Sequence, residues 1–145
     1  MFEQTIESII NQDEQSKNIF KGVFARNELP HIENYPTALI FNTQDRNMDG
    51  EHWLAVYFDS FNLCYFFDSY GQSPCYYGVT NYLKEYSRII NYNQKRIQGN
   101  SEYCGLYSIL FIFFAVRNNL KNFYSFFSTN LFLNDLFVFE NINKN

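Results

Sequence analysis

The sequence has little charge and no basic run. Only 18% of its 145 residues are Asp, Glu, Lys or Arg, and the net charge is −4. The nearest approach to a basic cluster is Lys95-Arg96, which is too short to follow a phosphate backbone. Strong nucleic-acid binding is therefore not expected. The hydrophobic fraction of 46% instead indicates a globular chain with a sizeable core.

Cysteine and histidine are also scarce. The three cysteines are Cys64, Cys75 and Cys104, with no CxxC pair, and the two histidines are His31 and His52. An odd number of cysteines without framework spacing argues against a disulfide scaffold and for free thiols in a reducing compartment. No two of these residues have the close spacing of a metal site. We therefore expect neither a metal ion nor any other cofactor.

No apolar run is long enough to cross a membrane. The longest, residues 104–116 (CGLYSILFIFFAV), ends at Arg117 and falls short of the ~20 residues that a spanning helix needs. The first residues, MFEQTIESII, are polar and acidic and do not resemble a signal peptide. We expect a soluble protein without a membrane partner.

Apolar periodicity predicts one α+β domain over residues 1–145, with a small central mixed sheet flanked by helices. A hairpin is expected at residues 60–62, and a turn at Asp49-Gly50. The expected strands are residues 37–42, 51–59, 63–68 and 95–98, and the expected helices are residues 5–11, 79–92, 104–116, 120–127 and 131–139.

Cys104 is a candidate nucleophile because it stands between a polar loop and the apolar helix, directly before Gly105. A thiol at a helix N-terminus gains from the helix dipole and the unpaired backbone N–H groups. Both lower its pKa from about 8.5 and favour the nucleophilic thiolate. Gly105 would let backbone approach a substrate closely. The alternative is a buried structural cysteine, which is the commoner role of a lone cysteine.

His52 and Asp68 stand at opposite ends of the predicted hairpin. The start of one hairpin strand faces the end of the other, so the two side chains are expected at one sheet edge. There Asp68 could orient the imidazole as a general base. Taken singly, His52 could be an ordinary strand histidine and Asp68 a turn-capping residue. Gln98, six residues before Cys104, could supply an oxyanion donor.

These motifs resemble the adenovirus-type cysteine endopeptidases (the adenain family), especially the proteases of Polinton/Maverick elements and related viruses. The resemblance rests on GVFARNELP, ALIFNT, GEHWLAVYF, YFFDSYG, IQGNSEYCGLY and, more loosely, STNLFLNDLFVF. It implies the adenain/SUMO-protease-like fold, with His52 as base, Asp68 as third triad member, Cys104 as nucleophile and Gln98 as oxyanion-hole residue. It also implies that Trp53 narrows the substrate groove.

The resemblance further implies a monomer that processes viral or transposon-encoded capsid or core precursors at Gly-containing sites, in the host nucleus or the virion. The chain departs from the adenoviral enzymes in having Asp68 where they have Glu. Family analogy allows activation by DNA, but the acidic composition gives it no support. Cys64 and Cys75 offer no recognisable site for a disulfide-linked activating peptide.

Two other functions stay open from the sequence. The first is a SUMO-type isopeptidase that removes ubiquitin-like modifiers by the same chemistry. The second is a catalytically silent domain that binds capsid proteins. The complete set of His52, Asp68, Gln98 and Cys104 favours an enzyme over the silent domain.

Overall fold

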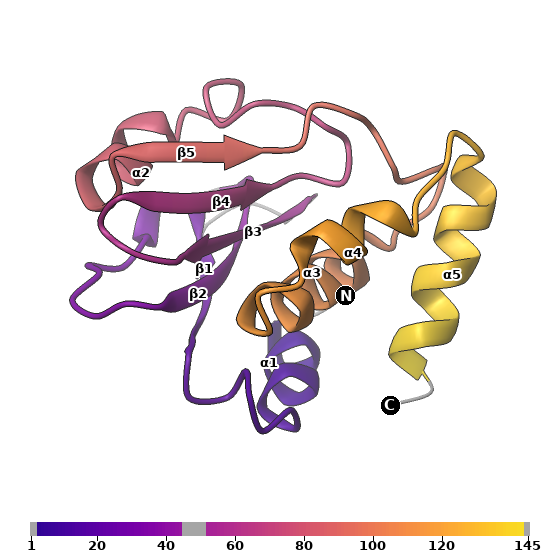
Figure 1. Cartoon of the computed structure of the whole chain (residues 1–145), viewed down its shortest axis with the longest axis horizontal. Helices are drawn as coiled ribbons and strands as arrows, with labels where there is room; N and C mark the ends of the chain where they lie inside the picture. The colour runs from indigo at the N-terminus through magenta and orange to yellow at the C-terminus, as the bar shows by residue number, and fades with distance from the viewer. Residues whose placement is uncertain (1–2, 45–51, 144–145) are drawn as a thin grey trace.

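The computed structural model describes residues 3–44 and 52–143. Within them a five-stranded mixed sheet is combined with five α-helices and one short 3₁₀ helix, so the predicted α+β class is confirmed (Figure 1). In chain order the elements are α1 Glu3–Asn11, β1 Phe20–Ala25, the 3₁₀ helix Arg26–Glu28, β2 Thr37–Asn42, β3 Trp53–Phe58, β4 Leu63–Phe67, α2 Thr80–Tyr86, β5 Ile89–Tyr92, α3 Cys104–Val116, α4 Leu120–Ser125 and α5 Leu131–Asn143.

The strands lie in sequence order, β1-β2-β3-β4-β5. The two outer pairs, β1 with β2 and β4 with β5, are parallel, and the central pairs are antiparallel. The predicted hairpin joins β3 to β4 through a turn in which Ser60 and Leu63 exchange backbone hydrogen bonds of 3.1 and 3.3 Å. Its register pairs Ala55 with Phe67. The residues that precede β3 and follow β4 therefore meet at one edge of the sheet.

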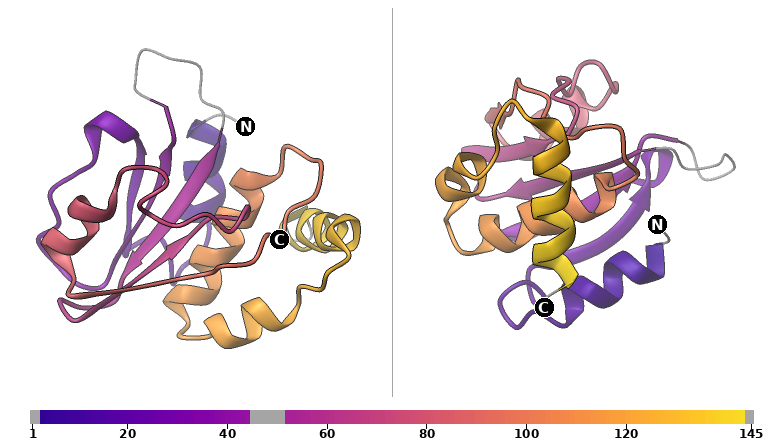
Figure 2. Two further views of the ribbon diagram at one scale, coloured as in Figure 1. Left: turned by 90° about the horizontal axis from the view of Figure 1, so that it is seen from above. Right: turned by 90° about the vertical axis from the view of Figure 1, so that its right-hand side faces the viewer.

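Alternating side chains of the central strands separate two hydrophobic layers. Ala55 and Tyr57 of β3 face the layer that contains α1, α3, α4 and α5. Leu54, Val56 and Phe58 face the layer that contains α2. Figure 2 shows α2 on the opposite side of the sheet from α3, α4 and α5. Both faces are covered, which explains why every residue of β2 and β3 is buried.

Rings fill the larger layer. Phe67 of β4 stacks on Phe111 of α3 with centroids 4.9 Å apart, and Phe123 of α4 meets both rings edge to face. All three side chains are completely buried. Stacked and edge-to-face pairs of this kind add to the free energy of ring burial. They hold α3, and thus its N-terminal residue Cys104, in a fixed position over the sheet.

Several predicted elements are confirmed. The strand over residues 37–42 has the predicted bounds, and α3 begins at Cys104 as expected. Within the described residues the next two strands cover Trp53–Phe58 and Leu63–Phe67, and each ends one residue earlier than predicted. The helix predicted over residues 131–139 continues to Asn143, and the one over 120–127 ends at Ser125. The predicted turn at Asp49-Gly50 lies outside the described residues.

Two predicted elements are wrong, and one strand is missing from the prediction. The helix over residues 79–92 is divided into α2 and strand β5, and residues 95–98 form no strand. Strand β1 is not predicted at all. The helix stops because Ser87 adopts an extended backbone conformation and its hydroxyl donates to the Ser60 carbonyl oxygen at 2.7 Å. The free edge of β4 then pairs with the chain that follows.

None of the described helices has both the length and the apolar character needed to cross a membrane.

Candidate active site

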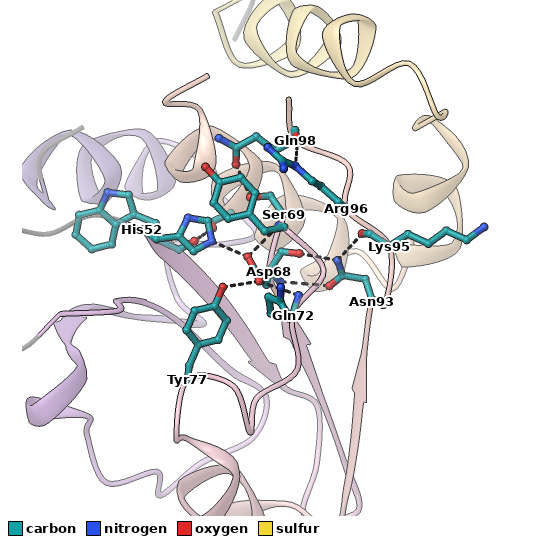
Figure 3. A network of polar contacts seen from close by, with 12 residues as sticks. His52, Asp68, Ser69, Gln72, Tyr77, Asn93, Lys95, Arg96 and Gln98 are labelled. Carbon is teal, nitrogen blue, oxygen red and sulfur yellow. Dashed lines mark hydrogen bonds and ion pairs between the residues drawn. The ribbon is translucent and has the colours of Figure 1, made fainter. Parts of the chain in front are cut away.

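The candidate site lies at one end of the central strands, where three elements begin or end. Its residues are His52, Asp68 and Cys104. His52 directly precedes β3, Asp68 directly follows β4 and Cys104 opens α3. The hairpin register places the first two side by side, with Nε2 of His52 2.5 Å from Oδ1 of Asp68 (Figure 3). Both side chains are buried, with 8% and 0% of their surface exposed. The predicted contact across the hairpin is therefore present.

Asp68 accepts hydrogen bonds from three further donors. The Tyr70 backbone N–H donates to Oδ1 at 3.0 Å, and the Gln72 N–H donates to Oδ2 at 2.9 Å. The Tyr77 hydroxyl also donates to Oδ2, at 2.6 Å. Burial alone would raise the pKa of this carboxyl, but His52, Tyr77 and the Tyr70 N–H outweigh burial and lower it. Asp68 is thus an ionised acceptor of fixed orientation.

The loop after β4 is held against the segment that follows β5. The Asn93 side chain forms hydrogen bonds with both backbone groups of Asp68 (Figure 3). Its Oδ1 accepts from the Asp68 N–H at 3.2 Å, and its Nδ2 donates to the Asp68 carbonyl oxygen at 2.6 Å. Gly71 has a φ of 77°, and a Cβ atom there would lie 2.6 Å from the backbone carbon of Lys95. Only glycine allows the two segments to approach so closely. Their contact sets the direction of the Asp68 carboxylate.

The imidazole of His52 is fixed by an aromatic ring. Tyr70 stacks on it with centroids 4.4 Å apart and an interplanar angle of 9°. The Arg96 guanidinium lies 4.9 Å from the centroid of the same tyrosine ring. With stacking on its face and Asp68 at Nε2, the histidine ring has one defined orientation.

Cys104 has the environment of a reactive thiol. It is buried, and burial alone would raise its pKa. The imidazole of His52 outweighs burial and lowers the pKa, with help from the backbone N–H groups of Trp53 and Gly105. No side chain among the described residues caps the N-terminus of α3. The first N–H groups of the helix are therefore available to negative charge at this end.

His52 and Cys104 shift each other's pKa in opposite directions. Burial would lower the pKa of His52, but Asp68 and Cys104 outweigh it and raise it to about 9. With Nε2 held by Asp68, only Nδ1 remains for the thiol. Nδ1 is buried and forms no hydrogen bond of full geometry with any described residue. Its interaction with the Cys104 thiol nevertheless contributes to the pKa shifts of both residues.

Gln98 is completely buried and lies between the Asp68 loop and the loop before α3. Its Oε1 accepts from the Ser69 hydroxyl at 2.5 Å, and its Nε2 donates to the Ser101 carbonyl oxygen at 2.8 Å. That carbonyl can only accept, which fixes the amide orientation. The second N–H has only a long contact of 3.4 Å with the Ser101 hydroxyl. Gln98 is thus linked to the Asp68 loop through Ser69. One N–H of its side-chain amide makes only this long contact.

Trp53 and Gly105 contact the thiol through their backbones. Trp53 is 8% exposed and belongs to the core layer, and Gly105 is buried in the first turn of α3. Their N–H groups help to lower the Cys104 pKa. The substrate-binding roles expected for these two residues stay predictions.

The sequence predicts the central residues of this site but not those that hold them. Tyr77, Asn93 and Arg96 act by contacts between segments distant in the chain, and no local pattern marks them. Tyr70 could have been found, because it follows Asp68 by two residues within the DSYG motif. Among the described residues, no group of three or more His, Cys, Asp or Glu side chains could hold a metal ion.

A comparison with known proteins gives a distant similarity. No protein-family model matches the chain. A protein of Acanthamoeba polyphaga mimivirus, named "Putative thiol protease", is 33% identical over 85 residues. The match covers 52% of this chain and 28% of the mimivirus protein, so the chain spans only a minor part of that relative. The chain is therefore distantly and partially similar to a protein named as a thiol protease.

Proposed function

We propose that this chain is a cysteine endopeptidase in which Cys104 is the nucleophile, His52 the general base and acid, and Asp68 the residue that orients His52. The observation that carries the proposal is the division of roles on the His52 ring. Nε2 is bound to a buried carboxylate, while Nδ1 is free beside a thiol whose pKa is lowered. The distant similarity to a protein named as a thiol protease supports it.

The chemistry begins from a thiolate–imidazolium pair. The Cys104 thiolate attacks the scissile carbonyl carbon, and the C=O electron pair moves to oxygen. Collapse of this intermediate breaks the C–N bond, and the proton on Nδ1 of His52 passes to the leaving amine. A thioester on Cys104 remains. Water then gives a proton to Nδ1 and attacks the thioester, which releases the acid and restores the thiolate.

The oxyanion would form beside the first turn of α3. The N–H groups at a helix N-terminus lack intrahelical acceptors, and we propose the Cys104 N–H as the first oxyanion donor. The weakly used N–H of Gln98 is the second donor that we propose. Donors fixed before substrate arrives stabilise the transition state without reorganisation, and losing one typically costs about 10²–10³-fold in kcat.

The substrates that we propose are viral or transposon-encoded capsid or core precursors cleaved at Gly-containing sites. This part rests on the motif resemblance, which also implies that Trp53 narrows the substrate groove. We further propose that the enzyme acts as a monomer in the host nucleus or the virion. The net charge of −4 gives no support to activation by DNA.

The test combines labelling with turnover. Iodoacetamide at neutral pH is expected to modify Cys104 much faster than Cys64. The protein is also expected to cleave some peptides of a panel that contains Gly sites. Cys104→Ala should lower turnover by at least about 10³-fold while the circular dichroism spectrum stays that of wild type. Cys75→Ala, which removes an exposed thiol, is the control and should keep full activity.

Other outcomes separate the alternatives. Cleavage of ubiquitin-like modifiers with C-terminal tags, without cleavage of the peptides, would identify an isopeptidase. Slow labelling together with no turnover on either substrate class would reject the enzyme and favour a binding domain. Unfolding of Cys104→Ala would indicate a structural cysteine.

A further inference from the structure

Helix α5 presents two buried polar residues, Asn134 and Asp135, to the segment that leads into the active site. Their exposed fractions are 2% and 7%. Oδ1 of Asp135 accepts from the Gly99 backbone N–H at 3.0 Å. Nδ2 of Asn134 donates to the Ile97 carbonyl oxygen at 2.9 Å. The two bonds hold the residues on either side of Gln98, 36 and 37 positions away in the chain.

The nucleophile helix joins the same contact through Tyr107. Its hydroxyl lies 2.7 Å from Oδ1 of Asp135 and 3.2 Å from the Ile97 carbonyl oxygen. Tyr107 follows Cys104 by three residues, close to one turn of α3. Asp135 is therefore bonded both to the helix that carries the nucleophile and to the loop that carries Gln98.

Gly99 shows how closely α5 approaches this loop. A Cβ atom at Gly99 would lie 2.7 Å from Oδ2 of Asp135 and 3.3 Å from the backbone carbon of Leu131. A contact under 3.0 Å forces one of the two atoms to move. A larger residue at this position would therefore displace the Asp135 carboxylate, whose Oδ1 is held by two hydrogen bonds.

Arg96 holds the loop from its other side. Its guanidinium donates to the carbonyl oxygens of Gln98 at 2.7 Å and Gly99 at 3.3 Å, while it lies over the Tyr70 ring that stacks on His52. The Gln98 backbone is thus fixed between Arg96 and α5, and its amide can take few other positions.

We propose that Asp135 is a positioning residue, which sets the distance between the proposed oxyanion donor Gln98 and the nucleophile helix. This inference rests on the proposed function. A buried carboxylate is costly to desolvate, and packing alone would be served as well by an apolar side chain. One oxygen of this carboxylate accepts hydrogen bonds from both the Gly99 loop and α3. It therefore links two parts of the site whose relative position must be kept for catalysis.

The experiment compares three α5 variants by two rates. Peptide hydrolysis gives kcat and KM, and alkylation of Cys104 by iodoacetamide reports the thiolate–imidazolium pair without any oxyanion. Asp135→Ala removes both hydrogen bonds and is expected to lower kcat at least tenfold, with KM and the alkylation rate within about twofold of wild type. Asp135→Asn retains an oxygen acceptor and should recover most of the lost kcat. Glu140→Ala removes an exposed carboxylate from the same helix and should match wild type in both rates.

The inference is overturned if Asp135→Ala keeps the wild-type kcat, or if kcat and the alkylation rate fall in proportion, which would indicate a purely structural role.

If thermal denaturation shows that Asp135→Ala does not fold, the Tyr107→Phe variant is used instead. It removes one hydroxyl and should lower kcat several-fold at an unchanged alkylation rate, and a wild-type kcat would reject the inference. Wild-type protein that is neither alkylated rapidly nor active rejects the proposed function itself, whereas active wild type with Asp135→Ala equal to Glu140→Ala rejects only the inference.

Discussion

At the scale of single residues, two buried cysteines show that burial alone does not determine thiol chemistry. Cys64 lies in the α2 layer, where burial raises its pKa to about 12 and the Ser87 hydroxyl offsets little of this. Cys104 is also buried, but His52 and backbone N–H groups lower its pKa. The difference comes from charge and hydrogen bonding around the sulfur, which only the fold brings together.

The pH dependence of turnover follows from the same pair. The lowered pKa of Cys104 keeps the thiolate present below the pH at which an ordinary thiol ionises, and the raised pKa of His52, about 9, keeps the imidazolium present up to that pH. We therefore expect kcat/KM for a peptide to rise in acid as the thiol ionises and to fall as the pH passes about 9. The apparent pKa values of the rising and falling sides of this pH profile belong to the coupled pair rather than to either residue alone.

Alkylation provides the control for this prediction. It needs the thiolate but no proton donor, so in a Cys75→Ala background its rate should rise on the acid limb and stay high above pH 9. A loss of turnover already between pH 6 and 7 would mean that His52 titrates near its ordinary pKa, and the ion pair would then be rejected.

Residue types and spacing predict the centre of the site but not its supports. His52, Asp68 and Cys104 could be proposed from the sequence because a hairpin and a helix start are local features. Asp135 could not, because its partner Gly99 is 36 positions away and no spacing rule connects a C-terminal helix to that loop. The long-range contacts that orient a site are decided by packing, which one sequence does not display.

At the scale of secondary structure, the strong hydrophobic patterns predict the central elements and fail at the sheet edge. Apolar residues at helical spacing predicted one helix over residues 79–92, yet the chain changes to strand β5 at Ile89. The backbone N–H groups of Arg88 and Ile89 donate to the carbonyl oxygens of Phe61 and Asn62, at 2.8 and 3.0 Å. Tertiary pairing with β4 thus overrides local helical periodicity.

The ring stack between β4 and α3 gives a test at this scale. Phe111→Ala should lower the free energy of unfolding by about 3–5 kcal/mol, because Phe111 is completely buried against Phe67 and Phe123. Phe132→Ala removes a ring of the same size that is 68% exposed on α5 and should change it by at most about 0.5 kcal/mol. Urea denaturation measures both. Similar losses in the two variants would contradict the assigned position of α3 over the sheet.

At the scale of the whole molecule, an ion pair joins segments that lie far apart in the chain. The Arg117 guanidinium, just after α3, binds the Asp13 carboxylate, just after α1, through two hydrogen bonds of 3.0 and 2.5 Å. The pair is 104 positions apart in sequence. It ties the N-terminal helix to the far end of the helix that carries Cys104. Burial would raise the pKa of Asp13, but Arg117 and Ser16 outweigh it and lower it.

This pair should contribute measurably, because its two-point geometry is better than that of most surface ion pairs. A double-mutant cycle with Asp13→Asn and Arg117→Met should give a coupling of about 0.5–1 kcal/mol at low salt and neutral pH, falling in 1 M salt. Because the folded-state pKa of Asp13 is lowered, the coupling is present above the ordinary pKa and should disappear as the pH falls through the lowered one. The exposed pair of Glu14 and Lys17, 2.9 Å apart at i,i+3, is the control. Both coupling free energies are measured by urea denaturation. Equal values for the two pairs would show that the Asp13–Arg117 ion pair does not stabilise the arrangement of α1 on α3.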